Sequence, residues 1–159
     1  MKLAIRPLTT ADKPAVMRIL KATPEFLPFE VTVAEELLDY FLEDAVGSGY
    51  HFLVAEAAST VVGYVCFGLT PLTEGTWYVY WIAAAPEHKG RGVGTALMAP
   101  AEAEIKKLEG RLVFVETSGK PEYENTRRFY AARGYTEICS ILDFYAPGDA
   151  KLILQKRLK

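Results

Sequence analysis

The chain has 159 residues, of which 50% are hydrophobic, 12% aromatic and 24% charged. This much apolar material fills a core, so a disordered chain and a small disulfide scaffold are excluded, and a single domain over residues 1–159 is expected. The formal net charge of −2 gives no general basic field for nucleic acid or an anionic membrane surface. No apolar run approaches the roughly 20 residues of a bilayer-spanning helix, so we expect a soluble, cytoplasmic protein.

The two cysteines, Cys66 and Cys139, lie far apart in the sequence, and neither belongs to a CxxC pair or a Cys/His cluster. Spacing of this kind does not fit a structural zinc site, so we expect no metal. Counting alone leaves a single disulfide open, but two buried, reduced thiols are the simpler interpretation.

The first third of the chain predicts a strand and two helices. Residues 3–6 suit a short strand, and apolar residues at helical spacing indicate a helix from about residue 10 to residue 22. Residues 23–31 contain two prolines and two phenylalanines, which is typical of an irregular loop. The capping-box pattern Thr32-Val33-Ala34-Glu35 then opens an amphipathic helix that ends near Gly47.

The rest of the chain predicts three successive strands and then alternating helices and strands. The third strand is apolar on both faces, as in a central strand that is covered on both sides. Pro100 lies inside the next helix and removes one hydrogen bond, so we expect a kink there or a helix broken in two. The predicted strands cover residues 50–56, 61–69, 76–85, 111–117, 135–145 and 151–158, and the helices cover 93–110 and 121–134. This order indicates an α/β domain with a mixed sheet.

A glycine-rich loop, Pro86-Glu87-His88-Lys89-Gly90-Arg91-Gly92-Val93-Gly94-Thr95, joins the third strand to that helix. Glycines allow positive φ and a close approach of the backbone to a ligand. The first N–H groups of a helix have no internal partner, and the helix dipole adds positive potential there. A phosphate or diphosphate therefore fits this loop, with a tight turn that binds nothing as the alternative. The P-loop and Rossmann glycine patterns do not match.

At these residues the chain resembles the GCN5-related N-acetyltransferase (GNAT) family. The acyl-CoA loop of the family, [Q/R]-x-x-G-x-[G/A], corresponds to Lys89-Gly90-Arg91-Gly92-Val93-Gly94, with lysine in the first position. The segment from Phe129 to Tyr135 is similar to the F-Y-x-x-x-G-[F/Y] segment of the family. The resemblance implies the acyl-CoA N-acyltransferase fold, a mixed, mostly antiparallel sheet of about seven strands flanked by four helices.

The resemblance also implies a function, transfer of an acetyl group from acetyl-CoA to a primary amine of a small molecule or peptide. A non-catalytic acyl-CoA-binding domain of the same fold is the alternative, and an unrelated nucleotide-phosphate-binding domain is a third. Direct attack by a neutral amine needs no covalent enzyme intermediate, so neither cysteine is required as a nucleophile. Dimers are common in the family, which makes a homodimer an alternative to a monomer.

Site residues are carried over from the family only where its motifs match. The backbone of Lys89, Gly90, Arg91, Gly92, Val93 and Gly94, with Thr95 next in line, is implied to hold the CoA diphosphate. The backbone of Ile82, Ala83 and Ala84 is implied to bind the thioester and the pantetheine arm. Tyr130 corresponds to the tyrosine that protonates the departing thiolate. The family often has an asparagine at the position of Tyr123, and whether Asn125 replaces it is open.

The general base and the acceptor pocket are less specified. Glu116 is the best carboxylate candidate for the base, against a salt-bridge role or a water chain relayed by backbone carbonyls or Tyr80. His88 and His51 are interpreted as a solvent-facing loop residue and a structural residue. Acceptor contacts are expected from the loop that carries Phe26 and Phe29, with Trp77, Tyr78 and Tyr80 on the opposite wall; ordinary core packing explains each of them as well.

Overall fold

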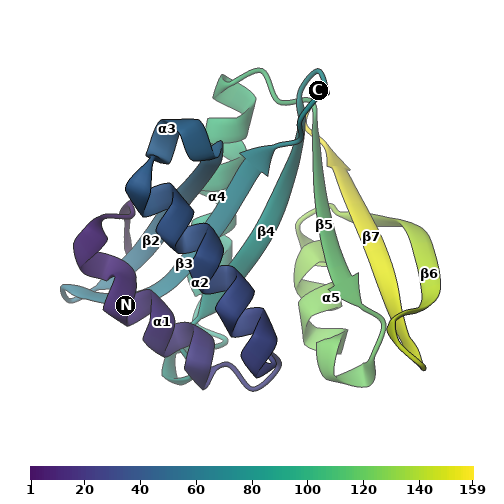
Figure 1. Cartoon of the computed structure of the whole chain (residues 1–159), viewed down its shortest axis with the longest axis horizontal. Coiled ribbons are helices and arrows are strands. Elements are labelled where there is room, and N and C mark those ends of the chain that lie inside the picture. The colour runs from purple at the N-terminus through teal and green to yellow at the C-terminus, as the bar shows by residue number, and fades with distance from the viewer.

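The computed structural model describes residues 1–159 as a seven-stranded sheet with helices on both faces (Figure 1). The strands are β1 (Ala4–Pro7), β2 (Tyr50–Ala57), β3 (Thr60–Leu69), β4 (Thr76–Ala84), β5 (Leu112–Ser118), β6 (Thr136–Ala146) and β7 (Asp149–Arg157), in the order β1-β2-β3-β4-β5-β7-β6. The helices are α1 (Lys13–Ala22), α2 (Pro28–Glu43), α3 (Ala45–Ser48), α4 (Val93–Lys107) and α5 (Glu124–Ala132). Only β4 and β5 pair in parallel. The predicted mixed, mostly antiparallel sheet is confirmed.

The helices number five where four were expected, and the second begins earlier than its sequence suggested. Pro28 occupies the first turn of α2, and the Glu30 carboxylate accepts a hydrogen bond from the Leu27 N–H at 2.7 Å. This start precedes the capping-box pattern at Thr32, so the irregular loop shrinks to residues 23–27. Asp44 then breaks the helix, and its side chain accepts from the Gly47 N–H to open the short α3.

Pro100 does not divide α4, which runs without interruption through it. The proline leaves the carbonyl of Ala96 without its usual helical donor. Ala96 is only partly buried, so the lost bond does not lie in the closed core of the domain. The expected break into two pieces is wrong.

Two apolar clusters cover the two faces of the sheet. One lies under α4 and α5 and includes Val93, Leu97 and Tyr130, and the other lies under α1 and α2 and includes Leu20 and Leu38. None of the helices is long and apolar enough to cross a bilayer.

The sheet opens in its middle, between β4 and β5 (Figure 1). These strands pair over only three positions, Thr76 to Tyr78, although β4 continues to Ala84. On its other side β4 stays paired with β3 through Ala84. A β-bulge interrupts this pairing at Tyr80, which has no partner residue between Cys66 and Phe67 of β3. The backbone groups of Ile82–Ala84 that point toward β5 are therefore left without a strand partner.

The central strand is covered on both faces only in its second half, where Trp81 and Ala83 pack under α1 and α2, so the expectation holds for only part of the strand. Trp77 and Val79 are buried in the cluster under α4, but Tyr80 on the opposite face is 39% exposed. The cluster under α1 and α2 takes no side chain from β5, β6 or β7, so this half of that face stays open. Trp77, expected on an acceptor wall, therefore lies in the core.

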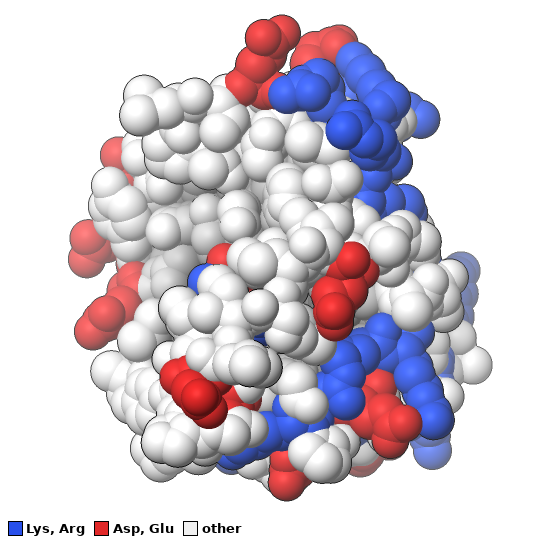
Figure 2. Space-filling model, turned by 90° about the vertical axis from the view of Figure 1, so that its right-hand side faces the viewer, with Lys and Arg blue, Asp and Glu red and all other residues white.

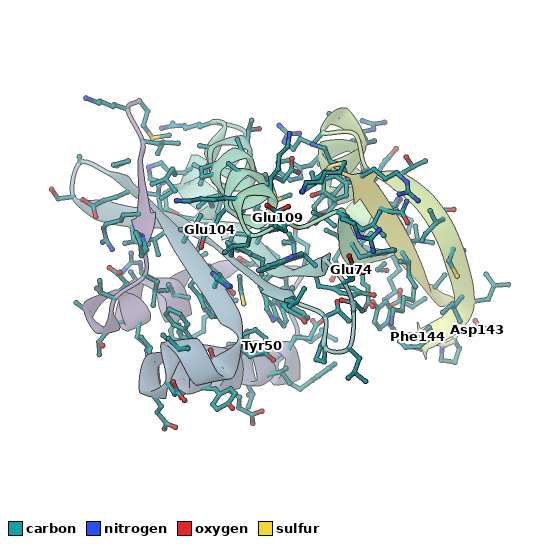
Figure 3. The ribbon with its side chains drawn as sticks, turned by 90° about the horizontal axis from the view of Figure 1, so that it is seen from above. Tyr50, Glu74, Glu104, Glu109, Asp143 and Phe144 are labelled. Atoms are coloured by element: carbon teal, nitrogen blue, oxygen red, sulfur yellow. The ribbon has the colours of Figure 1, made fainter.

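The last strand in the sheet order, β6, is exposed along its whole length. Its exposed residues include Leu142, Phe144 and Cys139, so the expectation of two buried thiols holds only for Cys66. In Figure 2 the side of the molecule that carries β6 is largely uncharged, with Lys and Arg gathered toward one margin and the lower end. Figure 3 shows Asp143 and Phe144 on this strand at the right of the view, with Tyr50 at about the same height nearer the middle.

Candidate active site

The glycine-rich loop passes from β4 through a short 3-10 turn, Pro86–His88, into α4. Gly90 and Gly92 have φ angles of +74° and +81°, in the left-handed region that favours glycine. Gly92 is the N-cap residue of α4, and its carbonyl accepts from the Ala96 N–H at 2.9 Å. The N–H groups of the first turn of α4 have no partner within the helix, so they are available to an anion.

The three glycines of the motif have different structural roles. A Cβ added to Gly90 or Gly92 would meet nothing within 4 Å, so the space above the loop is open. A Cβ on Gly94 would lie 2.8 Å from the Phe129 ring. Gly94 therefore serves the close approach of α4 and α5, while Gly90 and Gly92 form the open cradle.

A cavity of about 570 Å³ begins at this loop and extends to the open edge of β4. It brings together Tyr130, predicted as the proton donor, and most of the residues that the sequence assigned to the coenzyme. The coenzyme residues are Ile82, Ala83, Ala84, Lys89, Gly90, Gly92, Val93, Gly94, Thr95 and Asn125. Residues far apart in the chain thus share one cavity between β4, α4 and α5.

Five assigned residues do not line this cavity. Arg91 is exposed on the loop, and Phe26 packs its edge against Trp81 with ring centroids 5.3 Å apart. Phe29 is 66% exposed on the first turn of α2. Tyr80 and Glu116 lie on the open face of the sheet.

Other cavity residues were missed by the sequence reasoning: Glu25, His88, Glu122, Thr126, Phe129 and Arg133. A helical projection from Tyr130 could have found Thr126 and Arg133, because residues three or four apart share a helix face. Nothing in the sequence links Glu25 to the loop, yet its carboxylate lies 3.2 Å from the Lys89 ammonium. His88 was interpreted as solvent-facing, but its Nδ1 atom is buried without a hydrogen-bond partner.

Tyr123 and Asn125 occupy different positions around the cavity. The Tyr123 hydroxyl donates to the carbonyl of Glu25 at 2.9 Å and so holds the loop between α1 and α2. Asn125 lines the cavity, as the assigned asparagine should. His51 stacks on Phe67, and its Nδ1 lies 3.0 Å from Glu104, in keeping with a structural role.

Tyr130 is the titratable side chain buried deepest beside the open edge of β4. Only 5% of the residue is exposed, and burial raises the pKa of its phenol well above the ordinary value. The phenol is therefore protonated throughout the neutral range and can act as a proton donor.

The open face of the sheet carries a row of aromatic rings. Tyr50, Tyr80, Tyr78 and Phe114 follow one another with centroids 5.5 to 5.8 Å apart. Glu116 continues the row, and its carboxylate lies 3.1 Å from Lys151. Burial, followed by the nearby Glu116 carboxylate, raises the pKa of Tyr78, and the same two causes raise the pKa of Tyr145 to about 12.

The residues present fit an acyl-CoA donor. The cavity has an open cradle at Gly90 and Gly92, free helix N–H groups, and two buried polar atoms without partners, His88 Nδ1 and Arg133 Nε. The helix N–H groups and Arg133 Nε are donors, and unsatisfied donors beside an open space suit an anionic, phosphate-bearing ligand. No three His, Cys, Asp or Glu side chains lie close enough together to hold a metal ion.

The seven-stranded sheet that opens between β4 and β5, with a glycine-rich loop at the opening, matches the fold expected from the sequence. The family model described as "Acetyltransferase (GNAT) family" matches residues 14–135. The chain therefore belongs to the GNAT family, whose members use acetyl-CoA.

Similar proteins agree with this assignment. A crystal structure of a protein assigned to the GNAT acetyltransferases, from Desulfovibrio desulfuricans, has 39% identity and a TM-score of 0.95, covering 99% of this chain and 100% of that one. PaiA N-acetyltransferase from Thermoplasma acidophilum, in complex with coenzyme A, has 18% identity and a TM-score of 0.77 with 99% of both chains covered, and shows the fold alone.

A mycothiol acetyltransferase from Parafrankia sp. is 36% identical over 94 residues. This match includes 59% of the present chain but only 28% of the length of the Parafrankia protein.

Proposed function

We propose that the chain transfers an acetyl group from acetyl-CoA to a primary amine of a small molecule or peptide. The proposal rests on one observation. A single cavity is lined by the glycine cradle, the unpaired edge of β4 and the buried phenol side chain of Tyr130. The family membership supports acetyl transfer, and the relatives with printed activities act on several different acceptors. The class of acceptor is therefore proposed only as an amine.

The chain's own groups divide the work of this reaction. A bound acetyl thioester supplies an activated acyl carbon. The loop from Lys89 to Gly94 holds the diphosphate, and the backbone of Ile82–Ala84 orients the thioester arm for attack from the open face of the sheet. Tyr130 donates its proton to the sulfur as the carbon–sulfur bond breaks, and desolvation keeps that proton on the phenol until then.

The proton that the attacking nitrogen loses must leave by the open face. Glu116 is the carboxylate of the aromatic row, beside Tyr78 and Tyr80, and it is separate from the coenzyme cavity. We propose that Glu116 accepts this proton through a short chain of water molecules along these tyrosines. The proposal thus combines the carboxylate base and the water chain that the sequence analysis gave as alternatives. Its carboxylate also pairs with Lys151 of the neighbouring strand β7 at 3.1 Å.

Release of free thiol from acetyl-CoA, measured with a panel of primary amines, tests the proposal. At least one amine should accelerate thiol release well above hydrolysis, and mass spectrometry should find the acetylated amine. Tight binding of coenzyme A without transfer to any amine class would favour a non-catalytic acyl-CoA-binding domain. Equal affinity for coenzyme A, ATP and NAD in a titration would contradict both.

A further inference from the structure

Arg133 follows α5 directly and is held against the first turn of α4. One terminal nitrogen donates to the carbonyl of Phe129 at 2.7 Å, and the other hydrogen-bonds to the Thr95 hydroxyl. The guanidinium lies 3.9 Å from the centroid of the Phe129 ring. These contacts fix the plane of the group at the cavity, beside the N-terminus of α4.

Two Lys or Arg side chains line the cavity, Lys89 and Arg133, and only Arg133 has no carboxylate partner. Lys89 is paired with Glu25, and Arg128 is paired with Glu124 on its own helix. Arg91 does not line the cavity. The Nε atom of Arg133 is buried and has no hydrogen-bond partner. A guanidinium that is fixed, partly desolvated and without an acid is suited to an anionic ligand.

Coenzyme A presents two kinds of phosphate, a diphosphate and a monophosphate on the 3′ position of the ribose. The N–H groups and glycines of the loop already supply a cradle for the diphosphate. Arg133 does not belong to the loop; it lies beside it, against the side chain of Thr95 and the end of α5. It therefore adds a cationic side chain next to the backbone cradle, where a second phosphate group would need a partner.

We propose that Arg133 binds the 3′-phosphate of coenzyme A and so makes the protein select coenzyme A over dephospho-coenzyme A. The proposal rests on the proposed function, because it takes coenzyme A as the ligand. A planar guanidinium carries several N–H donors for phosphate oxygens, and charge-assisted bonds of this type change affinity by roughly ten-fold or more.

Calorimetric titration of coenzyme A and dephospho-coenzyme A into the wild-type chain and Arg133→Gln tests this. The wild type should bind coenzyme A about ten-fold more tightly than dephospho-coenzyme A. The glutamine variant should lose that preference through weaker binding of coenzyme A, with the affinity for dephospho-coenzyme A nearly unchanged. Arg128→Gln is the matched control, since Arg128 lies on α5, the helix that Arg133 follows, but outside the cavity, and it should keep the wild-type ratio.

The outcomes separate this proposal from the proposed function. If Arg133→Gln weakens both ligands equally, or neither, then Arg133 does not read the 3′-phosphate and the proposal is overturned while coenzyme binding stands. If the wild type binds neither ligand, the proposed function falls as well. If the glutamine variant is unstable, Arg133→Lys gives a second measurement, because it keeps the charge and loses the planar guanidinium. Its preference for coenzyme A over dephospho-coenzyme A should be smaller than that of the wild type but still present.

Discussion

The two sides of the split sheet, which we propose as the coenzyme side and the acceptor side, are built in different ways. On the coenzyme side, a continuous loop and the end of β4 present backbone groups, and α5 adds a few side chains. On the acceptor side, single side chains from β2, β4, β5 and β7 form the surface, and these residues are spread through the sequence from Tyr50 to Lys151. The first side depends on local backbone geometry, and the second depends on how distant strands are placed. Substitutions should therefore affect the two sides differently.

The largest effect is expected for Gly92→Val. A β-branched residue at φ +81° is strained, and its side chain would fill the space above the loop. We expect the affinity for coenzyme A, measured by calorimetry, to fall by about two orders of magnitude. Gly148→Val is matched in strain, because Gly148 also has φ +81° with nothing within 4 Å, and it lies in the turn between β6 and β7. Equal loss of affinity in both variants would mean that strain, not the cradle, is responsible.

Tyr130→Phe should separate chemistry from binding on the coenzyme side. The ring stays packed, so coenzyme affinity should hardly change, while kcat in the thiol-release assay should fall by roughly one to two orders of magnitude. Because burial raises the pKa of Tyr130, the wild type should show no alkaline loss of kcat from this group below pH 10.

Tyr135→Phe is the control for that experiment. Tyr135 is equally buried, but its hydroxyl donates to Glu102 at 2.8 Å and it does not line the cavity. Its loss should lower the free energy of unfolding by about 1 kcal/mol and leave kcat unchanged. A Tyr130→Phe variant with wild-type kcat would remove Tyr130 from the mechanism.

The two sides also differ in how far the sequence predicted them. The coenzyme side could be predicted because its glycines, the helix start and the F-Y-x-x-x-G segment are local signals, and local geometry follows from local residues. The acceptor side could not, because Tyr50, Tyr80 and Glu116 become neighbours only through the sheet order and the early separation of β4 from β5. The same limit explains why the burial of Trp77 and the exposure of Tyr80 were not distinguished: alternation gives two faces but not which one is covered.

Helix starts show a second limit. The pattern at Thr32 satisfies the capping box, but Pro28 and Glu30 satisfy a competing start one turn earlier. The earlier start prevailed and shortened the loop that carries Phe26, which then packed against Trp81. A choice between two adequate local signals is made by tertiary packing, which the sequence pattern does not contain.

Glu116→Gln tests the acceptor side. If Glu116 accepts the proton, kcat at neutral pH should fall by about ten-fold and recover as rising pH deprotonates the free amine, with coenzyme affinity unchanged. Glu102→Gln is the control, because Glu102 also pairs with a lysine, Lys156 at 2.6 Å, but lies away from the open face. A fall in kcat that is the same at every pH would point to lost packing or charge balance at Lys151 and against a base.

The smallest effect is expected where the two sides meet, at Glu25. This residue belongs to the loop between α1 and α2, and its carboxylate both lines the coenzyme cavity and pairs with Lys89. Glu25→Gln should release the Lys89 ammonium to the phosphates and remove one negative charge from the cavity, so coenzyme affinity should rise by about three-fold, less at high salt. Glu122→Gln removes a second cavity carboxylate that has no lysine partner, and it should give a smaller rise. If Glu25→Gln weakens coenzyme binding instead, the Glu25–Lys89 ion pair holds the glycine-rich loop in the conformation that binds the coenzyme. The loop between α1 and α2 would then contribute directly to the affinity for the coenzyme.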